Sequence, residues 1–493
     1  MRRTKILATV GPACDAPGPL LRMLAAGVDG FRLNVSHGSH EDHRATLARL
    51  RTARRRARHE FAIVVDVQGP KLRIGEVVGD AVRLAKGSRW TLDRSSVPGD
   101  RHRVFADLPS FEAAARAGDP VLLGDGDIAL EVLRTGPDAI ETRVVNGGTV
   151  RSHAGLFLPH ARLRASAFGP RDRAEAALAL DQGFDYLALS FVRNERDVRS
   201  ARQWLDRRPG GSSVGIIAKV ERAEALQNLD GILRAADGIM VARGDLGIEV
   251  PLERLALEQK MLVRRANAAG KFSIVATQML LSMLTSPRPT RAEATDVANA
   301  VLDGADAVML SEESAVGQHP VEAVRWLDRI AEATEAEFDP RPARAVVTSG
   351  DAGGAELSVA RAAVDLAENV RARAIVTPTH SGRTARLIAA LRPGCPVLAL
   401  SSSGSVRRRL SLVRGVRSFP AIAHSDLESL RERSLQLLPG SRDSPTGPLV
   451  LTAGYPVEGR PTNLVTLVDA ESGSLGSPRG RARPRSRSRP DGC

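Results

Sequence analysis

The chain has 493 residues and a formal net charge of +13, with 43% hydrophobic, 26% charged and 3% aromatic residues. This length exceeds what one hydrophobic core accommodates, so we expect two to four domains. The scarcity of aromatics argues against a stacking platform for single-stranded nucleic acid. The chain contains no run of about 18 apolar residues, so the sequence predicts no membrane-spanning helix. Three widely spaced cysteines fit a reducing, cytoplasmic location without a disulfide framework.

Eight strand-like runs alternate with helix-like segments through the first two thirds of the chain. A fully buried parallel strand reads as a continuous apolar run, and each of these runs fits that description. The intervening segments, such as 173–180 and 255–269, have helical periodicity. Eight such units predict an α/β protein built on a (β/α)₈ TIM barrel. The runs are residues 5–10, 30–34, 61–67, 186–191, 215–221, 238–243, 272–277 and 307–311.

One long insertion, residues 71–164, separates the third run from the fourth. Around Trp90 it alternates apolar with polar residues, and turn signals follow at Pro98-Gly99-Asp100 and Asn146-Gly147-Gly148. These patterns predict a small β-rich domain. Because the insertion follows a strand end, we expect it to sit on the mouth of the barrel as a hinged lid. The barrel then comprises residues 1–70 and 165–338.

After the barrel the α/β pattern restarts, and residues 340–470 predict a third domain with an open sheet. Strand-like runs occur at 374–377, 396–400 and 448–452, and helix-like segments at 356–369 and 384–391. Residues 472–493 hold six arginines against one aspartate in a Ser/Pro/Gly-rich context, which predicts a disordered basic tail. The tail could contact nucleic acid, but no base-reading element accompanies it, so a solvated extension is the favoured interpretation.

Polar side chains follow at least six of the predicted strands, at the end where barrels place chemistry. Lys219 and Glu221 are two residues apart, so on a strand they point to the same side. With Asp245 they make two carboxylates without histidine or cysteine ligands, which favours Mg²⁺ or Mn²⁺. Arg32 and Lys219 supply the positive charge that phosphoryl transfer needs. A purely structural buried salt bridge would explain one pair of opposite charges, such as Lys219 and Glu221. It does not explain why at least six strands are followed by polar side chains.

Several motifs of the chain resemble pyruvate kinase, in the order of that family, from about Thr4 to Asp469. The resemblance implies that phosphoenolpyruvate and ADP are converted to pyruvate and ATP, the last step of glycolysis. It also implies that the lid closes over the site, that the third domain is regulatory and that the enzyme is a homotetramer. The motifs are RLNVSHG at 32–38, DVQGPKLR at 66–73, IAKVE at 217–221, ARGDLG at 242–247, ATQML at 276–280, PRPTRAE at 287–293 and SEES at 311–314.

The resemblance further implies a role for each residue of the site. The implied groups are Glu221 and Asp245 for Mg²⁺; Lys219 and Arg32 for the transferred phosphoryl group; Arg243, Gly244, Asp245 and Thr277 for the substrate; Thr277, Ser311 and Glu313 near the route of the proton to the enolate; and Asn34, His37 and Arg73 for the nucleotide phosphates.

Two residues depart from the pattern of potassium-dependent members of the family. Lys71 stands where those members have glutamate, and Val67 stands where a threonine commonly assists the ion. An ammonium group there could replace the charge of K⁺, so we expect activity without added K⁺. Asn34, Ser36 and Asp66 remain as potential ligands of a monovalent ion.

The segment that precedes the helix-like residues 384–391 has two interpretations. Small and hydroxyl residues at a helix start bind anions, and in the family this loop binds a phosphorylated effector. Alternatively, Ser381 or Thr384 is an ordinary cap of the free N–H groups. The first interpretation predicts a sugar-phosphate or nucleotide activator, and the residues involved are Ser381, Gly382, Arg383 and Thr384.

Two other functions remain open on the residues alone. One is a related Mg²⁺-dependent barrel that acts on pyruvate or phosphoenolpyruvate by carbon–carbon chemistry, and the insertion and the third domain argue against it. The other is a catalytically weakened metabolite sensor, and the retention of the polar strand ends argues against that. The sequence does not identify the effector, the nucleotide preference or the immediate proton donor.

Overall fold

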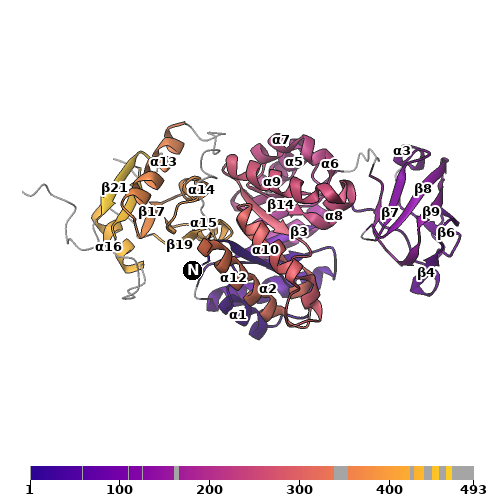
Figure 1. The fold of residues 1–493 in the computed structure, drawn as a ribbon, viewed down its shortest axis with the longest axis horizontal. Coiled ribbons are helices and arrows are strands. Elements are labelled where there is room, and N and C mark those ends of the chain that lie inside the picture. The colour runs from indigo at the N-terminus through magenta and orange to yellow at the C-terminus, as the bar shows by residue number, and fades with distance from the viewer. Residues whose placement is uncertain are drawn as a thin grey trace, which may run out of the picture.

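The structure is a computed structural model that describes residues 2–57, 59–108, 110–124, 126–159, 166–337, 354–421, 427–437, 447–454 and 462–468. It forms three units in a row: a central barrel, the inserted β domain (the described residues between 71 and 159) and the C-terminal α/β domain (those between 354 and 468), as Figure 1 shows. No helix of these ranges is long and apolar enough to span a membrane. The predicted basic tail lies outside the described residues.

Eight parallel strands close into a barrel in the order β1-β16-β15-β14-β13-β12-β3-β2. The predicted fold class is confirmed, and each strand lies within its predicted range. Nearly every strand residue is buried, because the strands pack side chains both inside the barrel and against the outer helices. The strands are β1 (Lys5–Thr9), β2 (Gly30–Asn34), β3 (Ala62–Val67), β12 (Tyr186–Leu189), β13 (Gly215–Val220), β14 (Gly238–Ala242), β15 (Phe272–Ala276) and β16 (Ala307–Leu310).

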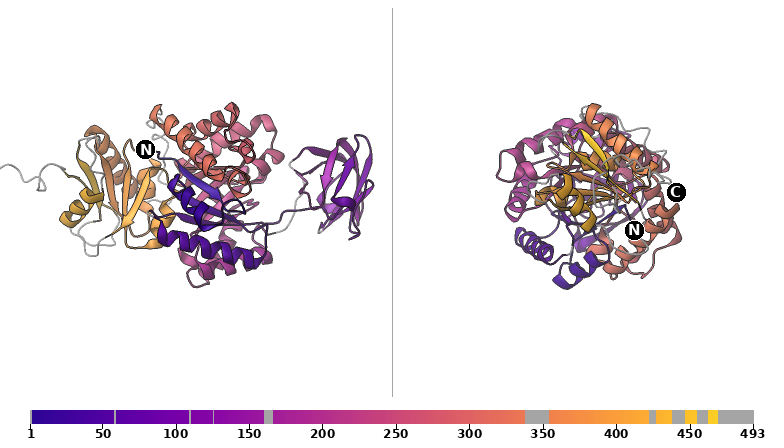
Figure 2. Two further views of the ribbon diagram at one scale, coloured as in Figure 1. Left: turned by 90° about the horizontal axis from the view of Figure 1, so that it is seen from below. Right: turned by 90° about the vertical axis from the view of Figure 1, so that its left-hand side faces the viewer.

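Helices surround the barrel, as the end-on view of Figure 2 (right) shows. Their apolar faces join the outer sides of the strands in one core, which includes Leu47, Trp204 and Leu327. The helices are α1 (Pro17–Ala25), α2 (His40–Arg56), α4 (Pro170–Gln182), α5 (Glu195–Asp206), α6 (Ala223–Gln227), α7 (Leu229–Ala235), α8 (Arg243–Glu249), α9 (Leu255–Ala268), α10 (Arg291–Leu302), α11 (Glu312–Ala315) and α12 (Pro320–Glu337), with 3₁₀ turns η2 (Gly211–Ser213), η3 (Leu252–Arg254) and η4 (Leu281–Leu284).

The inserted β domain has its own core around Trp90, Leu92 and Phe111. Its main sheet has the order β11-β7-β8-β9-β5-β6, and β10 pairs with β4 beside it. The elements are η1 (Val78–Asp80), β4 (Ala81–Leu84), β5 (Arg89–Asp93), β6 (Arg103–Phe105), α3 (Phe111–Ala114), β7 (Pro120–Leu123), β8 (Ile128–Thr135), β9 (Ala139–Asn146), β10 (Gly148–Arg151) and β11 (Leu156–Phe157). Figure 2 (left) shows this domain standing away from the barrel at one end of the molecule.

The C-terminal α/β domain has a five-stranded sheet in the order β19-β18-β17-β20-β21, with β21 antiparallel. Three of its strands were predicted; β19 and β21 were missed, the former because Arg417 and Ser418 interrupt its apolar pattern. The elements are α13 (Gly354–Asn369), β17 (Ala374–Pro378), α14 (Arg383–Ala390), β18 (Val397–Ser401), α15 (Gly404–Leu410), β19 (Val416–Pro420), α16 (Leu427–Leu437), β20 (Leu449–Ala453) and β21 (Leu464–Val468).

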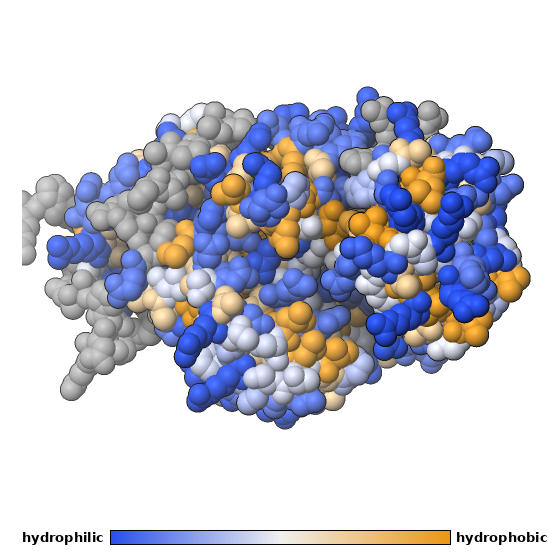
Figure 3. All heavy atoms as spheres, turned by 45° about the vertical axis from the view of Figure 1, so that its right-hand side comes forward, coloured by the Kyte–Doolittle hydropathy of each residue, from blue (hydrophilic) through white to orange (hydrophobic). Residues whose placement is uncertain are grey.

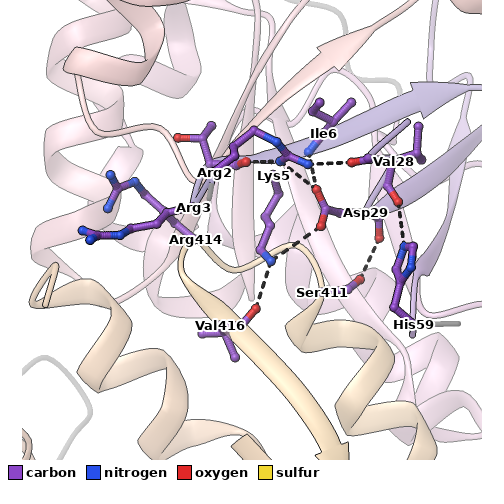
Figure 4. A network of polar contacts seen from close by, with 12 residues as sticks. Arg2, Arg3, Lys5, Ile6, Val28, Asp29, His59, Ser411, Arg414 and Val416 are labelled. Atoms are coloured by element: carbon purple, nitrogen blue, oxygen red, sulfur yellow. Dashed lines mark hydrogen bonds and ion pairs between the residues drawn. The ribbon is translucent and has the colours of Figure 1, made fainter. Parts of the chain in front are cut away.

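The barrel and the C-terminal α/β domain meet through a buried polar network around Asp29 (Figure 4). The Asp29 carboxylate lies 2.9 Å from a terminal guanidinium nitrogen of Arg2 and 3.5 Å from the Lys5 ammonium. Lys5 also donates to the Val416 carbonyl at 2.9 Å, and the Ser411 hydroxyl donates to the Asp29 carbonyl at 2.9 Å. These contacts join the amino ends of the barrel strands to the third domain, so the opposite end of the barrel is left for the inserted β domain.

Candidate active site

Lys219 lies near the carboxyl end of β13 and is surrounded by three oxygen partners. Its ammonium nitrogen is 2.8 Å from Glu221 Oε1 and 3.2 Å from Asp66 Oδ1, and it donates to Ser190 Oγ at 2.7 Å. Burial lowers the pKa of Lys219, but Asp66 and Glu221 more than offset this and raise it above the ordinary value. Lys219 is therefore a fixed positive charge at the mouth of the barrel.

Asp66, the fifth residue of β3, holds two cations at once. Besides Lys219, its carboxylate accepts from Arg32 Nε at 2.6 Å, and a terminal nitrogen of Arg32 donates to Thr9 Oγ1 at 3.0 Å. Burial opposes ionisation of this carboxyl, yet the two cations lower the pKa of Asp66 below its ordinary value. One ionised aspartate thus places the charges of Lys219 and Arg32 side by side.

Glu221 and Asp245 are the two carboxylates predicted to bind a divalent ion. Glu221 Oε2 accepts from the Phe191 amide at 2.7 Å, which orients the side chain. Burial raises the pKa of Glu221, Lys219 opposes this, and the nearby charge of Asp245 adds to it. A cation shared by the two carboxylates would relieve that repulsion. The described residues contain no group of three or more histidine, cysteine or carboxylate side chains arranged for a metal. Two carboxylates alone fit an ion such as Mg²⁺ that keeps waters and substrate oxygens.

The start of α8, directly after β14, and the loop after β15 bring the N–H group of Gly244 beside the hydroxyl of Thr277. The Gly244 amide donates to Thr277 Oγ1 at 2.8 Å. Thr277 has a φ of 71°, which is strained for a β-branched residue and is typical of functional sites. The Arg243 guanidinium holds this geometry: it pairs with Asp296 at 2.6 Å and donates to the Thr277 carbonyl at 2.7 Å. Arg243 therefore positions the loops with its side chain.

Ser311 and Glu313, predicted to lie near the proton route, have different environments. Glu313 is fully buried, and its two oxygens accept from the backbone amides of Leu280 and Ser311 at 3.0 and 2.7 Å. These bonds tie the loop after β15 to the loop after β16. Ser311 Oγ is buried and has no hydrogen-bond partner among the described residues. Ser311 is therefore the better candidate for direct contact with a bound molecule, and Glu313 fixes the backbone around it.

A cavity of about 460 Å³ lies between the barrel mouth and the inserted β domain, where the surface of Figure 3 is hollowed. Lys71, Arg73 and Arg171 contribute positive charge to its wall, and His153 lines it from the inserted β domain. Arg73 donates to the His153 carbonyl at 2.9 Å, so the predicted nucleotide residue is held within the inserted β domain, near the point where the chain leaves the barrel. Glu76 and Asp107 also line the cavity, so its three cations outnumber two carboxylates. An excess of positive charge suits the phosphates of a nucleotide.

Asn34 and His37 are the other predicted nucleotide residues. Asn34 is the last residue of β2, and His37 lies in the loop that follows it. Burial lowers the pKa of His37, and the positive charges of Arg73, Arg32 and Lys71 lower it further. His37 is therefore close to the same cationic group and largely neutral at pH 7. Asn34 Oδ1 accepts from the Ser36 amide at 3.2 Å, which shapes the start of the loop.

Lys71, predicted to replace the charge of K⁺, pairs with a carboxylate of the site. Its ammonium is 3.1 Å from Asp245 Oδ1 and 5.5 Å from the centre of the Phe157 ring. Asp66, one of the predicted ligands of that ion, is instead paired with Arg32 and Lys219. The Lys71 charge therefore acts on the carboxylate pair.

The loop before α14, predicted to bind an effector, is well ordered by its own side chains. The Gly382 amide donates to Thr379 Oγ1 at 2.9 Å, and the Arg383 amide is 3.4 Å from Ser381 Oγ. The N-cap residue itself is Gly382, and no side chain caps the start of α14. Arg383 Nε donates to Glu356 at 2.7 Å, and the hydroxyls of Thr384 and Thr462 are 2.9 Å apart. An anion bound here would have to compete with Glu356 for Arg383.

Two residues of the site were missed by the sequence analysis. Ser190 follows β12 and accepts from Lys219, and the rule that strand ends carry chemistry would have included it. Arg171 lies in the first turn of α4 and faces the cavity. It has no local signal, because only the return of the chain from the inserted β domain brings it to the mouth of the barrel.

Comparisons with known proteins identify the family of the chain. A family model described as pyruvate kinase, barrel domain, matches residues 1–324, and one described as pyruvate kinase, alpha/beta domain, matches residues 357–468. A pyruvate kinase of Geobacillus stearothermophilus is 40% identical over 470 residues, covering 94% of this chain and 80% of that protein. One of Methylorubrum extorquens is 40% identical over 480 residues, covering 94% and 97%. The crystal structure of a pyruvate kinase from Cryptosporidium parvum superposes with a TM-score of 0.88 at 34% identity and covers 95% and 96%.

Proposed function

Because the chain belongs to the pyruvate kinase family, we propose that Lys219, Glu221 and Asp245 form the centre at which it carries out the reaction of that family. The protein is a phosphotransferase of glycolysis, and its family acts on phosphoenolpyruvate and ADP. The observation that carries the assignment is the position of the Lys219 ammonium, within 3.2 Å of both Asp66 and Glu221 at the barrel mouth. A lactate-dehydrogenase-coupled assay with phosphoenolpyruvate, ADP and Mg²⁺ tests it.

The phosphoryl group of phosphoenolpyruvate is assigned to Arg32 and Lys219. Both cations are held by Asp66, so their positions are set before substrate binds. A transferring phosphoryl group spreads negative charge over its oxygens, and fixed positive charges in a partly buried site stabilise that charge. Lys219 remains an ammonium throughout, because its pKa is raised. It therefore acts as an electrostatic group and does not donate its proton.

Glu221 and Asp245 are assigned as the protein ligands of Mg²⁺, which Mn²⁺ could replace. When bound, the ion neutralises charge on the transferred group and on the substrate oxygens. For Glu221 to bind it, one carboxylate oxygen remains with the Phe191 amide while the other leaves Lys219 for the ion. Asp245 likewise would have to share its oxygen with Lys71.

The carboxylate of the substrate is assigned to the Gly244 amide and the Thr277 hydroxyl, which lie 2.8 Å apart. Asp245 follows Gly244 directly, so substrate and metal ligands share one turn of α8. After transfer, the enolate takes a proton from the side of Thr277 and Ser311, through a hydroxyl or a bound water. Glu313 supports this step by fixing the Ser311 amide. ADP is assigned to the cavity lined by Arg73, together with Asn34 and with His37, whose pKa the charge of Arg73 lowers.

The enzyme is expected to work without added K⁺. The Lys71 ammonium supplies a permanent positive charge beside Asp245, and the possible ligands Asn34, Ser36 and Asp66 are not needed to recruit an ion. Assays in sodium-free Tris buffer, with and without KCl at equal ionic strength, should give kcat values that differ by less than about twofold, since the salt then acts only through screening. Lys71→Ala should become K⁺-stimulated. A several-fold stimulation of the unmodified enzyme by KCl would contradict the assignment.

We also propose that the loop before α14 binds a phosphorylated activator. A sugar phosphate or AMP bound at Ser381, Gly382, Arg383 and Thr384 should lower the half-saturating concentration of phosphoenolpyruvate. Arg383→Ala should weaken that response by about tenfold, because a charge-assisted contact to phosphate is lost. Titrating the panel against both proteins measures this. If no compound shifts the substrate curve, the loop is only a helix cap.

The remaining assignments follow the family. We propose a homotetramer in the cytoplasm, with a barrel of residues 1–70 and 165–338, a lid of residues 71–164 and a regulatory domain of residues 340–470. The separate core of the inserted β domain, around Trp90, supports its treatment as a lid that moves as one body.

A further inference from the structure

The chain crosses between the barrel and the inserted β domain twice, and one carboxylate holds both crossings. Asp172 Oδ1 accepts from the Gly69 amide, on the outgoing crossing, at 3.0 Å. Its Oδ2 accepts from the Gly169 amide, on the returning crossing, at 2.9 Å. Gly169 is the cap of α4, so that bond alone would be ordinary helix capping. The bond to Gly69 spans 103 residues of sequence and does not belong to capping.

The outgoing crossing is also packed tightly against the catalytic centre. Gly69 has a φ of +64°, and a Cβ at this position would lie 2.9 Å from the Ser190 carbonyl oxygen. Ser190 in turn accepts from the Lys219 ammonium at 2.7 Å. Two residues beyond Gly69, Lys71 reaches Asp245. A shift of this crossing would therefore displace Lys71 and the Arg73 that follows it.

The same turn of α4 holds the loop that follows β2. Glu175 lies 3.0 Å from His43 Nδ1 with one oxygen and 3.0 Å from His40 Nε2 with the other. The second ring nitrogen of His43 is 2.7 Å from the His37 carbonyl oxygen. His43 and Glu175 are both buried, so this chain of contacts is shielded from water. It fixes the backbone of His37.

Arg171, between Gly169 and Asp172, faces the cavity between the barrel and the inserted β domain. The start of α4 thus supplies three groups: Arg171 on the wall of the cavity, Asp172 as the anchor of both crossings, and Glu175 as the anchor of the loop that contains His37. Burial raises the pKa of Asp172 above its ordinary value, and the bonds from the Gly169 and Gly69 amides offset only part of this shift, so both crossings favour the ionised form of the buried carboxylate.

We propose that Asp172 is a positioning residue for ADP: with Glu175 it holds the two crossings and the His37 loop on one rigid helix, so that Arg73 and Arg171 meet the nucleotide. This inference rests on the proposed placement of ADP beside Arg73. Arg32, Lys219 and Thr277, assigned to phosphoenolpyruvate, are held mainly by partners at the strand ends: Asp66, Glu221 and the Gly244 amide. Loss of the Asp172 anchor should therefore affect them less than it affects Arg73 and Arg171. The consequence is a selective effect on one substrate.

The test is the variant Asp172→Asn, which replaces one acceptor oxygen by an amide that cannot accept from an N–H. The KM for ADP should rise at least about fivefold, while the KM for phosphoenolpyruvate changes less than about twofold, since only the anchored elements move. Hydrogen–deuterium exchange of the peptide that covers residues 68–72 should also become faster.

The matched control is Asp185→Asn. Asp185 is a buried aspartate that accepts from the Ile63 amide at 2.9 Å, at the other end of β3 from Gly69, and it also pairs with Arg54 and Arg408. Asp185→Asn should therefore lower the melting temperature at least as much as Asp172→Asn, without separating the two KM values. An unchanged KM for ADP in Asp172→Asn, with a melting temperature lowered as in the control, would show that Asp172 only caps α4 and would overturn the proposal.

The variant Arg73→Ala separates this proposal from the assignment of the nucleotide site. If Arg73→Ala leaves the KM for ADP unchanged, ADP binds elsewhere and the assigned nucleotide site fails. In that case hydrogen–deuterium exchange of residues 68–72 tests the role of Asp172 by itself. Faster exchange in Asp172→Asn would show that Asp172 anchors the crossings, and unchanged exchange would show that it does not.

Discussion

Replacing Lys219 by methionine is expected to lower kcat by about three orders of magnitude or more, since fixed charge at a transferring phosphoryl group contributes several kcal/mol to transition-state stabilisation. Methionine is similar in length and carries no charge. The change removes the cation that lies 2.8 Å from Glu221 and 3.2 Å from Asp66. Single-turnover measurement of ATP formation, at saturating phosphoenolpyruvate and ADP, reports the effect on the chemical step.

A second buried lysine provides the control for this variant. Lys5 lies at the amino end of β1, pairs with Asp29 and donates to the Val416 carbonyl, far from the mouth of the barrel. Lys5→Met and Lys219→Met each remove one cation from a buried carboxylate that keeps another, Arg2 for Asp29 and Arg32 for Asp66, so both should lower the melting temperature. Only Lys219→Met should lose turnover per folded molecule. Near-normal kcat in Lys219→Met would remove this residue from the proposed mechanism.

Asp245→Asn is the second substitution with a large expected effect. It leaves one carboxylate, Glu221, for the divalent ion, and an amide is a much poorer ligand for Mg²⁺. The Mg²⁺ concentration for half-maximal activity should rise at least about tenfold, because even outer-shell changes at metal sites cost that much. Direct titration with Mn²⁺, followed by electron paramagnetic resonance, should show the same weakening without reference to turnover.

The control for Asp245→Asn lies on the same helix. Glu249 ends α8 and pairs with Arg222 at 3.2 Å, so Glu249→Gln removes one negative charge of α8 without touching the proposed ligands. Its Mg²⁺ requirement should equal that of the unmodified enzyme. Equal Mn²⁺ affinity of Asp245→Asn and the unmodified enzyme would contradict the ligand assignment.

The geometry also bears on the two alternative functions. A barrel that performs carbon–carbon chemistry on the same substrates would not require the cavity between barrel and inserted β domain, with Arg73 and Arg171 on its wall. A weakened sensor would not require the strained Thr277, whose φ of 71° brings its hydroxyl to the Gly244 amide. Both features are accounted for by transfer of a phosphoryl group to a nucleotide.

The barrel and the polar strand ends could be predicted from the sequence, because both depend on local patterns. An apolar run such as 215–220 specifies a strand buried on both faces, and the charge that follows it specifies the end of that strand. Lys219 and Glu221 meet because they are two residues apart, a spacing that fixes their side of the chain. The assignment to the family followed from the same motifs and is confirmed by the comparisons.

Only the tertiary structure decided which of these groups touch. Lys219 reaches Ser190 across 29 residues of sequence, Gly69 reaches Asp172 across 103, and Lys71 reaches Asp245 across 174. No local pattern encodes such pairs, since they depend on the closure of the barrel and on where the inserted β domain leaves and rejoins it. For the same reason the sequence did not show that Glu313, predicted near the route of the proton, accepts from the amides of Leu280 and Ser311, and it did not single out Asp172.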